Sequence, residues 1–341
     1  MGAPALSIVL PVRNEVAHLG DVLRQLQAQT LSPEDYEVLV VDGHSEDGTA
    51  DLVHAFMDDM PNLSLLENPD GWASAARNTG AAAARGQYVL FIDGHCTIRE
   101  PDMLEAALNA FRSGERCLSR PQPLVEANGQ GYGAAVSLAR GSFIGHYAPS
   151  KIYSCEDLRC NPLTAGCGYE LDLFRRLGGI DESFDAAEDL EFNYRVHQAG
   201  VDAFHSGKFT VEYRPRNSFL GLFRQMYRYG YGRARLTRKH PQAVSGMGLL
   251  LGLLALYFLV LPVLGLIQPH AWTLWTAVAA PYALLTGAVA AWRARGRGTR
   301  MFLWTWSSFI PIHLGAGLGY VSGLVRGPDW SHVRPGTATG R

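Results

Sequence analysis

The sequence predicts an α/β domain built on a mostly parallel sheet, followed by an α-helical membrane region. Short apolar runs alternate with amphipathic helical patterns through the first part of the chain, and this alternation is typical of βαβ units. Three long apolar segments lie towards the C-terminal end, each long enough to cross a bilayer core of roughly 30 Å. The chain of 341 residues has room for both parts.

Four apolar runs are candidate strands that are buried on both faces of a sheet. In chain order they cover residues 6–12, 37–42, 63–66 and 88–93. The second run ends in Asp42 and the fourth in Asp93. Because ligands of open α/β sheets bind outside the carboxyl ends of the strands, we expect both acids at a functional edge of the sheet.

Helical patterns separate these runs. Apolar residues recur at helical spacing at Leu19, Val22, Leu23 and Leu26, and again at Leu52, Val53 and Phe56. A loop rich in helix-capping residues, 43–49, precedes the second helix. Residues 73–84 and 102–111 are further helices, and the acid-rich segment 186–195 starts another. Residues 115–170 contain many Gly and Pro and carry no motif that assigns them.

The fourth run ends in Asp93-Gly94-His95. A carboxylate and an imidazole two residues apart are plausible ligands of a divalent cation. Asp-Gly is also a common turn pair, so a strand that simply ends in a turn explains the same residues. These few residues leave both interpretations open.

Composition argues against several classes of protein. Thirty basic residues stand against 32 acidic ones, which argues against binding of nucleic acid by the whole chain. The five cysteines form no Cys-x-x-Cys pair, so neither a zinc knuckle nor a disulfide framework is indicated. We expect Cys155, Cys160 and Cys167 to be reduced thiols in a cytosolic domain.

Basic and aromatic residues interleave in residues 216–245. The basic ones are Arg224, Arg228, Arg233, Arg235, Arg238 and Lys239. This mixture suits an amphipathic helix at an anionic membrane surface. Nucleic-acid binding is the alternative, but the apolar segments that follow argue against it.

The three apolar segments cover residues 248–267, 271–292 and 302–325, which together with their links form a membrane region at 246–326. Tryptophans near the segment ends fit interfacial belts, and glycines offer faces for close helix packing. These residues are Trp272, Trp275, Trp292, Trp304 and Trp306, with Gly248, Gly252, Gly315, Gly319 and Gly323. A buried helical hairpin of a soluble protein is a much weaker interpretation at these lengths.

The positions of basic residues predict an orientation in the membrane. The basic cluster before the first span and the loop between the second and third spans should both be cytosolic. The link at 268–270 and the tail 327–341 then face outwards. We therefore expect residues 1–215 to form a cytosolic domain of catalytic size in a multi-pass membrane protein.

Five motifs occur in a fixed order along the first 190 residues. They are Leu10-Pro-Val-Arg-Asn-Glu15, Val41-Asp-Gly-His-Ser-Glu-Asp-Gly-Thr49, Ala76-Arg-Asn78, Asp93-Gly-His95 and Glu188-Asp189. The ordered set resembles the inverting glycosyltransferases of family 2, which have the Rossmann-like GT-A fold. Membrane-attached members of the succinoglycan glucosyltransferase type, which build bacterial exopolysaccharide, look most similar because they pair such a domain with C-terminal spans.

The resemblance implies a nucleotide-sugar site. Pro11 and Arg13 would border the nucleotide, and Ser45 would belong to the same group. Glu15 and Asp42 would accept hydrogen bonds from uracil or ribose. Arg77 would lie near the diphosphate, whose oxygens a guanidinium can pair bidentately.

The resemblance also implies the catalytic groups. Asp93 and His95 would hold Mg²⁺ or Mn²⁺, which neutralises charge on the departing nucleoside diphosphate. Asp189 would be the general base for the acceptor hydroxyl, and Glu188 would orient that base or the acceptor. The metal motif usually ends in Asp, and His95 in its place tilts the preference from Mg²⁺ towards Mn²⁺.

A last motif lies in the basic segment. Gln225, Arg228 and Tyr229 are similar to a Gln-x-x-Arg-Trp signature, in which the Arg supports the diphosphate. Tyr in place of Trp weakens any prediction of processive polymer synthesis. Taken one at a time, the site residues also have ordinary structural explanations, as helix caps, surface charges or first-turn acids.

These motifs predict inverting transfer of one sugar from a nucleotide sugar, a UDP-hexose, to a polyprenyl-linked saccharide at the lipid bilayer. One alternative is a polyprenyl-phosphate sugar synthase, whose acceptor is the lipid phosphate. Another, of a different class, is a non-catalytic membrane sensor or scaffold that binds nucleotide sugars. A transporter is disfavoured because the three spans contain virtually no charged residues.

Overall fold

The computed structural model describes residues 2–124, 129–146, 151–184, 186–212 and 216–326. The chain forms two compact units. The first combines Met1–Pro123 with Lys151–Tyr213, and the second combines Leu124–Ser150 with Arg214–Arg341. The predicted domain boundary at residue 215 and the predicted tail 327–341 lie outside the described residues.

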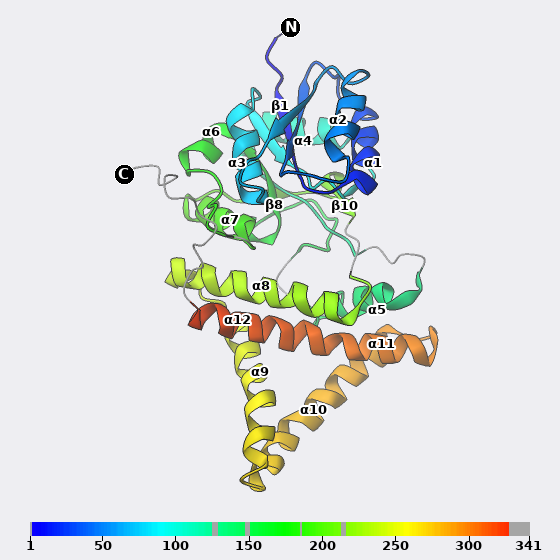
Figure 1. Ribbon diagram of the computed structural model, residues 1–341, viewed down its shortest axis with the longest axis vertical. Helices are drawn as coiled ribbons and strands as arrows, with labels where there is room; N and C mark the ends of the chain where they lie inside the picture. Colours follow the sequence, from blue (N-terminus) through cyan, green and yellow to red (C-terminus); the bar gives the residue numbers. More distant parts are fainter. Residues whose placement is uncertain (1, 125–128, 147–150, 185, 213–215, 327–341) are drawn as a thin grey trace. The chain divides into compact units, whose positions relative to one another are not determined.

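The first unit is built on an eight-stranded sheet of order β3-β2-β1-β4-β8-β6-β9-β7 (Figure 1). The strands are β1 (Leu6–Val12), β2 (Tyr36–Asp42), β3 (Leu63–Glu67), β4 (Tyr88–Phe91), β6 (Cys117–Ser119), β7 (Leu158–Cys160), β8 (Gly166–Glu170) and β9 (Ala203–His205). β1 pairs in parallel with β2 and β4, and β2 pairs in parallel with β3. β8 is antiparallel to both β4 and β6. The predicted α/β fold with a mostly parallel sheet is confirmed.

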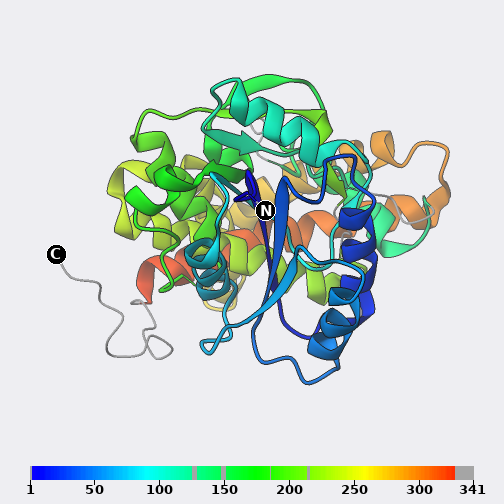
Figure 2. The ribbon, with the colours of Figure 1, turned by 90° about the horizontal axis from the view of Figure 1, so that it is seen from above.

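Helices cover both faces of this sheet. They are α1 (Val16–Gln27), α2 (Thr49–Met57), α3 (Ala73–Ala83), α4 (Met103–Arg112), α6 (Leu171–Arg176) and α7 (Glu188–Gln198). One core contains apolar side chains of α1 and α4, and the other contains those of α3, α6 and α7. Figure 2 shows α1 and α2, in blue, on one side of the strands and α3 on the other. A small second sheet pairs β5 (Thr97–Ile98) with β10 (Val211–Glu212).

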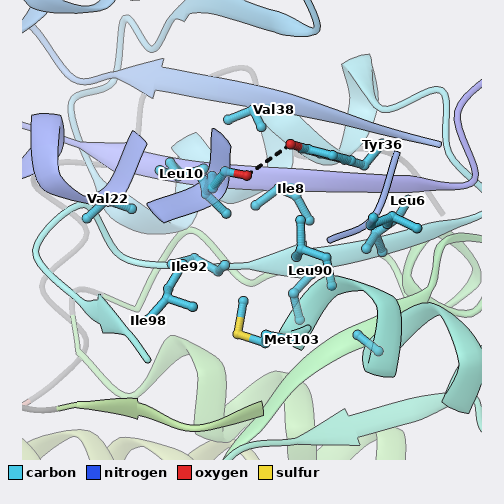
Figure 3. Close-up of a cluster of buried hydrophobic side chains, with 14 of the residues drawn as sticks. Leu6, Ile8, Leu10, Val22, Tyr36, Val38, Leu90, Ile92, Ile98 and Met103 are labelled. Atoms are coloured by element: carbon cyan, nitrogen blue, oxygen red, sulfur yellow. Dashed lines mark hydrogen bonds between the residues drawn. The ribbon is translucent and has the colours of Figure 1, made fainter. Parts of the chain in front are cut away.

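The central strands are apolar throughout because each of their faces is covered. Ile8 and Leu10 point into one core and Val9 into the other, and all three are fully buried. Figure 3 shows the first of these cores, where Tyr36 lies among the aliphatic side chains. Its hydroxyl donates a 2.9 Å hydrogen bond to the carbonyl of Leu26, so the buried oxygen keeps a partner.

The second unit is helical. It contains α5 (Gly131–Arg140), α8 (Phe219–Lys239), α9 (Gly246–Gly265), α10 (His270–Arg293), α11 (Gly298–Ile310), a π-helical turn (Pro311–Gly315) and α12 (Ala316–Val325). Three stretches of the described chain are long and apolar enough to cross a membrane, namely Gly246–Gly265, His270–Arg293 and Gly298–Val325. The first two are 17% buried over their most apolar windows and the third is 56% buried.

Glycines bring α8 and α12 into backbone contact. A Cβ added at Gly319 would lie 2.0 Å from the carbonyl oxygen of Tyr227, and one at Gly230 would lie 1.9 Å from that of Ala316. Tyr227 also donates a 2.7 Å hydrogen bond to Ser322 across the same pair. Small residues therefore set the distance between these two helices.

Gly319→Ala should separate α8 from α12, because the new methyl group has no room beside the Tyr227 carbonyl. We expect a loss of about 1–3 kcal/mol in the free energy of unfolding, the usual cost of overpacking. Thermal unfolding of the detergent-solubilised protein measures it. Gly246→Ala is the matched control, since nothing lies within 4 Å of its added Cβ. Equal stability of the two variants would contradict the prediction.

Candidate active site

The carboxyl ends of β1, β2 and β4 meet at one edge of the sheet. Val12 pairs with Asp42, and Val9 pairs with Phe91 at the end of β4. The predicted strand 88–93 ends two residues early, so Asp93 lies just beyond the strand in the loop. The edge expected from the sequence therefore exists, and Asp42 and Asp93 both lie on it.

Hydrogen bonds tie the loop after β1 to the loop after β2. The Asn14 amide donates to Ser45 Oγ at 2.8 Å, and the Glu46 amide donates to Asn14 Oδ1 at 2.9 Å. The Glu15 amide donates to Thr49 Oγ1 at 2.9 Å. Asn14 adopts a positive φ of 56°, which its short polar side chain tolerates. The two motifs thus form one structure although some 30 residues separate them.

Asp42 holds its own loop in place. Its carboxylate accepts hydrogen bonds from the Ser45 amide at 3.0 Å and from Ser45 Oγ at 2.5 Å. Pro11 lies in β1, paired with Val41, and the guanidinium of the exposed Arg13 lies near Gly71. These residues line the end of the sheet where the resemblance places a nucleotide, and their contact with one stays a prediction.

Arg77 lies at the centre of the site. One terminal nitrogen donates to Glu188 Oε1 at 2.5 Å and the other to Asp93 Oδ1 at 3.1 Å. The Arg77 side chain is only 13% exposed, and that of Glu188 is 16% exposed. This guanidinium joins α3, the loop after β4 and the first turn of α7. The structure thus brings together three of the residues that the sequence assigned to the site.

Charge around Asp93 favours its ionised form. Burial alone would raise the pKa of Asp93, but the guanidinium groups of Arg77 and Arg120 outweigh it and hold that pKa below its usual range. Asp93 is therefore an anion at neutral pH. It remains the most accessible member of the group, with 37% of its side chain exposed.

Arg120 is a site residue that sequence reasoning missed. It follows β6, is 6% exposed, and donates a 2.7 Å hydrogen bond to the carbonyl of Phe91 at the end of β4. Its Nε has no hydrogen-bond partner among the described residues. No motif marks this arginine, because β6 is a three-residue strand in the segment that the sequence left unassigned.

Asp189 lies beside this cluster at the start of α7. Ala187 takes a positive φ of 62° at the N-cap, and Asp189 Oδ1 accepts a 2.7 Å hydrogen bond from the Leu190 amide. Asp189 is exposed at the surface, yet the protein packed around its carboxylate and the neighbouring Glu188 carboxylate raise its pKa, against the opposing charge of Arg77. A carboxylate with a raised pKa is a better proton acceptor than an ordinary Asp.

His95, predicted as a metal ligand, lies in contact with Glu15. Its Nδ1 is 2.9 Å from Glu15 Oε1, and its side chain is 53% exposed. Within the described residues, no group of three His, Cys, Asp or Glu side chains could hold a metal ion. The donors available are therefore the Asp93 carboxylate, the imidazole of His95 and the nearby Glu15. A cation held by one or two protein groups would complete its shell with substrate phosphate oxygens and water.

The remaining predicted residues lie on α8 in the second unit. Gln225 is buried and donates a 3.3 Å hydrogen bond to the Tyr229 hydroxyl, one helical turn away. Arg228 lies on the exposed side of the helix. The role of Gln225, Arg228 and Tyr229 towards a diphosphate stays a prediction.

Family models match most of the chain. The model described as glycosyl transferase family 2 matches residues 7–139, and that described as glycosyl transferase family group 2 matches residues 88–290. The chain belongs to glycosyltransferase family 2. The family assignment made from the motifs is thereby confirmed.

Curated relatives are similar over different lengths. Succinoglycan biosynthesis protein ExoA of Rhizobium meliloti is 28% identical over 252 residues, which cover 70% of this chain and 72% of that protein. Glycosyltransferase AglE of Haloferax volcanii is 38% identical over 95 residues, which cover 28% of this chain and 31% of AglE. The match to ExoA therefore covers most of this chain, whereas the match to AglE covers less than a third of it.

Among solved structures, the mannosyltransferase PcManGT from Pyrobaculum calidifontis, in complex with GDP-Man and Mn²⁺, has a TM-score of 0.58 to this chain. The two are 18% identical, and the alignment covers 95% of this chain and 88% of the other. The likeness confirms the GT-A fold expected from the sequence.

Proposed function

We propose that the protein transfers a single sugar from a UDP-hexose, with inversion, to a polyprenyl-linked saccharide at the cytosolic face of a bacterial membrane. The observation that carries this proposal is the Arg77 bridge between Asp93 and Glu188, with Asp189 beside it. Transfer from a nucleotide sugar requires positive charge beside the diphosphate, a ligand for a cation and a general base for the acceptor hydroxyl. In this proposal Arg77, Asp93 and Asp189 provide these three groups. The similarity to ExoA supports a place in exopolysaccharide synthesis.

On the donor side, each proposed role follows from charge and position. Arg77 pairs with the diphosphate oxygens, for which a guanidinium offers two parallel donors. Glu15 and Asp42 accept hydrogen bonds from the nucleoside, and Pro11, Arg13 and Ser45 form the loop edge around it. For Gln225, Arg228 and Tyr229, a role in supporting the diphosphate is proposed from the resemblance of their motif alone.

Asp93 and His95 are the residues that would hold a divalent cation. The charge on Asp93 and its exposure fit this role, and PcManGT provides a precedent in its complex with GDP-Man and Mn²⁺. When bound there, a cation would supply positive charge against the negative charge that develops on the departing nucleoside diphosphate. Arg77 and Arg120 contribute to the same stabilisation from the protein side.

Asp189 is the proposed general base. The acceptor hydroxyl oxygen forms a bond to the anomeric carbon while the bond from that carbon to the diphosphate oxygen breaks. Asp189 takes the hydroxyl proton, and the nucleoside diphosphate leaves from the opposite face, so the configuration inverts. Glu188, fixed by Arg77, orients the base.

The acceptor side rests on the second unit. Its helices expose long apolar surfaces, including Leu253 at 67% and Leu284 at 74% exposure, and a lipid bilayer is the environment that suits them. A membrane-embedded acceptor would be retained beside an enzyme anchored in this way. The predicted segments at 1–215, 216–245 and 246–326 correspond to the catalytic, interfacial and membrane parts of the proposal.

Release of nucleoside diphosphate from a set of UDP- and GDP-sugars, with polyprenyl-linked saccharides as acceptors, tests the proposal. We expect release only with a UDP-hexose, dependent on the acceptor and on an added cation. Donor binding measured by calorimetry without any release would instead favour the non-catalytic sensor. Release with bare polyprenyl phosphate as the acceptor would favour the sugar-phosphate synthase.

His95→Asp should shift the cation preference from Mn²⁺ towards Mg²⁺, because a second carboxylate replaces a neutral imidazole. Rates measured with each cation in parallel give the preference as a ratio, which we expect to change by about tenfold. His44→Asp is the control, since His44 bonds the Pro69 carbonyl on a neighbouring loop. An unchanged ratio in His95→Asp would remove His95 from the metal site.

A further inference from the structure

We propose that the third apolar segment, Gly298–Val325, lies flat in the membrane interface beside α8, and that only α9 and α10 cross the bilayer. Length and composition alone make this segment a candidate span, like the other two. Its surroundings within the second unit are different. Three independent observations separate it from α9 and α10.

The first observation is that α12 runs along α8 in the same direction over several turns. Glycines of the π-helical turn and of α12 contact successive turns of α8: Gly315 lies against Phe223, Gly319 against Tyr227 and Gly323 against Tyr231. Figure 1 shows the two helices, in red and yellow-green, side by side along their lengths. Two helices that stay in contact over several turns have similar inclinations to the membrane, so the inclination of α12 follows that of α8.

The inclination of α8 follows from its charge. Six basic residues are spread over its length, at Arg224, Arg228, Arg233, Arg235, Arg238 and Lys239. Arginine near the middle of a span is among the most costly residues to place in hydrocarbon. A basic amphipathic helix of this kind lies in the plane of the interface instead. The same plane must then contain α12.

The second observation concerns the middle of the segment. His313, in the π-helical turn, is 2.8 Å from the carbonyl oxygen of Ile144 and 2.9 Å from the Tyr282 hydroxyl. Ile144 belongs to a non-helical turn, 141–146, in which Phe143 is 61% exposed. Exposed irregular backbone does not occur in the hydrocarbon region. The middle of a true span would place this turn at the centre of the bilayer.

The third observation is the contrast with α9 and α10. These two helices form a hairpin, joined through Phe258 packed against Trp275 and Tyr282. Most of their surface is exposed and apolar, and Leu266 and Ile267 at the tip are 80% and 75% exposed. A helix of 20 residues spans about 30 Å, which matches the bilayer core. Figure 1 shows the hairpin leaving the plane of α8 and α12 at a steep angle.

A consequence for topology follows. With two crossings instead of three, the end of α12 lies on the same side of the membrane as the loop between α10 and α11. Three crossings would instead put the tail outside, together with the 268–270 link. The two arrangements make opposite predictions for one position, Arg326.

Cysteine labelling from each side of the membrane tests this. Gln268→Cys, Arg295→Cys and Arg326→Cys are introduced singly into the full chain, with the exposed native Cys155 changed to Ser. All three positions are exposed in the structure. Sealed right-side-out and inverted vesicles are treated with a membrane-impermeant maleimide, and detergent-opened vesicles give the total.

We expect Arg326→Cys to label from the same side as Arg295→Cys and from the side opposite to Gln268→Cys. Labelling of Arg326→Cys together with Gln268→Cys would show a third crossing and overturn the proposal. Labelling of all three positions from one side would overturn it as well, since the hairpin would then not cross. The result does not depend on any enzymatic activity, so it stands apart from the proposed function.

Discussion

Asp189→Asn is expected to lower kcat by about 10²–10⁴-fold and at the same time to raise the free energy of unfolding. The loss of rate follows because an amide cannot take the proton of the acceptor hydroxyl. The gain in stability should be small: desolvation by the protein packed around its carboxylate and the Glu188 carboxylate raise the pKa of Asp189, but Asp189 is exposed and solvent screens the repulsion. Steady-state kinetics and chemical denaturation of the same preparation measure the two effects.

The stability gain from Asp189→Asn should depend on pH, and the direction of this dependence follows from the pKa of Asp189. The raised pKa of Asp189 means that its charged form is less favourable in the fold than in the unfolded chain. The gain from Asp189→Asn should be present near pH 7 and disappear below the ordinary Asp pKa of about 4. The wild-type rate should likewise fall with decreasing pH at a higher pH than an unperturbed Asp would give.

Asp51→Asn is the matched control, because Asp51 is an exposed acid in the first turn of α2. It should leave kcat unchanged and slightly lower the stability, since a first-turn acid favours the helix. Full activity in Asp189→Asn would contradict the role of general base. Such a result would favour a lipid phosphate as acceptor, because a phosphate needs no base.

Arg77→Met should abolish turnover and also destabilise the fold, the opposite effect on stability from that of Asp189→Asn. Removing the guanidinium leaves the Glu188 and Asp93 carboxylates without the partner that bonds them at 2.5 Å and 3.1 Å. We expect a loss on the order of 2–3 kcal/mol in the free energy of unfolding, towards the lower end for a broken buried pair because Asp93 is partly exposed. Denaturation at pH 7 measures the loss.

Lowering the pH should reduce the difference in stability between the wild-type protein and Arg77→Met. Because Arg77 and Arg120 hold the pKa of Asp93 low, against the effect of burial, the stability gained from the pair is present above the unfolded pKa of about 4. It is lost as the pH falls through the lower folded pKa. Arg24→Met, which removes an ion pair with both side chains more than 60% exposed, is the control and should cost at most about 0.5 kcal/mol. Equal effects of the two substitutions would show that the Arg77 bridge contributes nothing.

The sequence predicts the parallel half of the sheet well because its strands are apolar on both faces. β1 begins and ends where the apolar run 6–12 does, and β2 begins one residue before its run. The strand predicted from the fourth run is two residues too long, because Ile92 continues the apolar pattern after β4 has ended at Phe91. Periodicity registers burial, and Ile92 is fully buried without belonging to the strand.

The half of the sheet from β8 to β7, which contains both antiparallel and parallel pairs, could not be predicted, because its strands are short and their partners are distant in sequence. β8 lies between β4 and β6, and two of its five residues are glycines. A Cβ on Gly168 would lie 2.9 Å from Leu90 Cδ1, so glycine is needed there for close packing and not for a turn. Sequence patterns do not distinguish these two uses of glycine.

The site was predictable as a set of motifs but not as a set of contacts. Ordered motifs identify Arg77, Asp93 and Glu188, yet only the fold shows that one guanidinium bonds both carboxylates. A hydrogen bond to the carbonyl of Phe91, on another strand, holds Arg120 at the site, and no sequence pattern around residue 120 reveals this contact. The same limit applies to Gly298–Val325, because hydropathy measures composition and not what a helix packs against.

The Arg77 bridge has a consequence for the order in which ligands bind. Before any donor arrives, the site supplies its own counterion, since Arg77 neutralises the carboxylate that the proposed function assigns to a cation. A diphosphate that draws Arg77 towards itself frees Asp93 at the same moment. Donor and divalent cation should therefore bind with positive linkage, each raising the affinity for the other by the same factor.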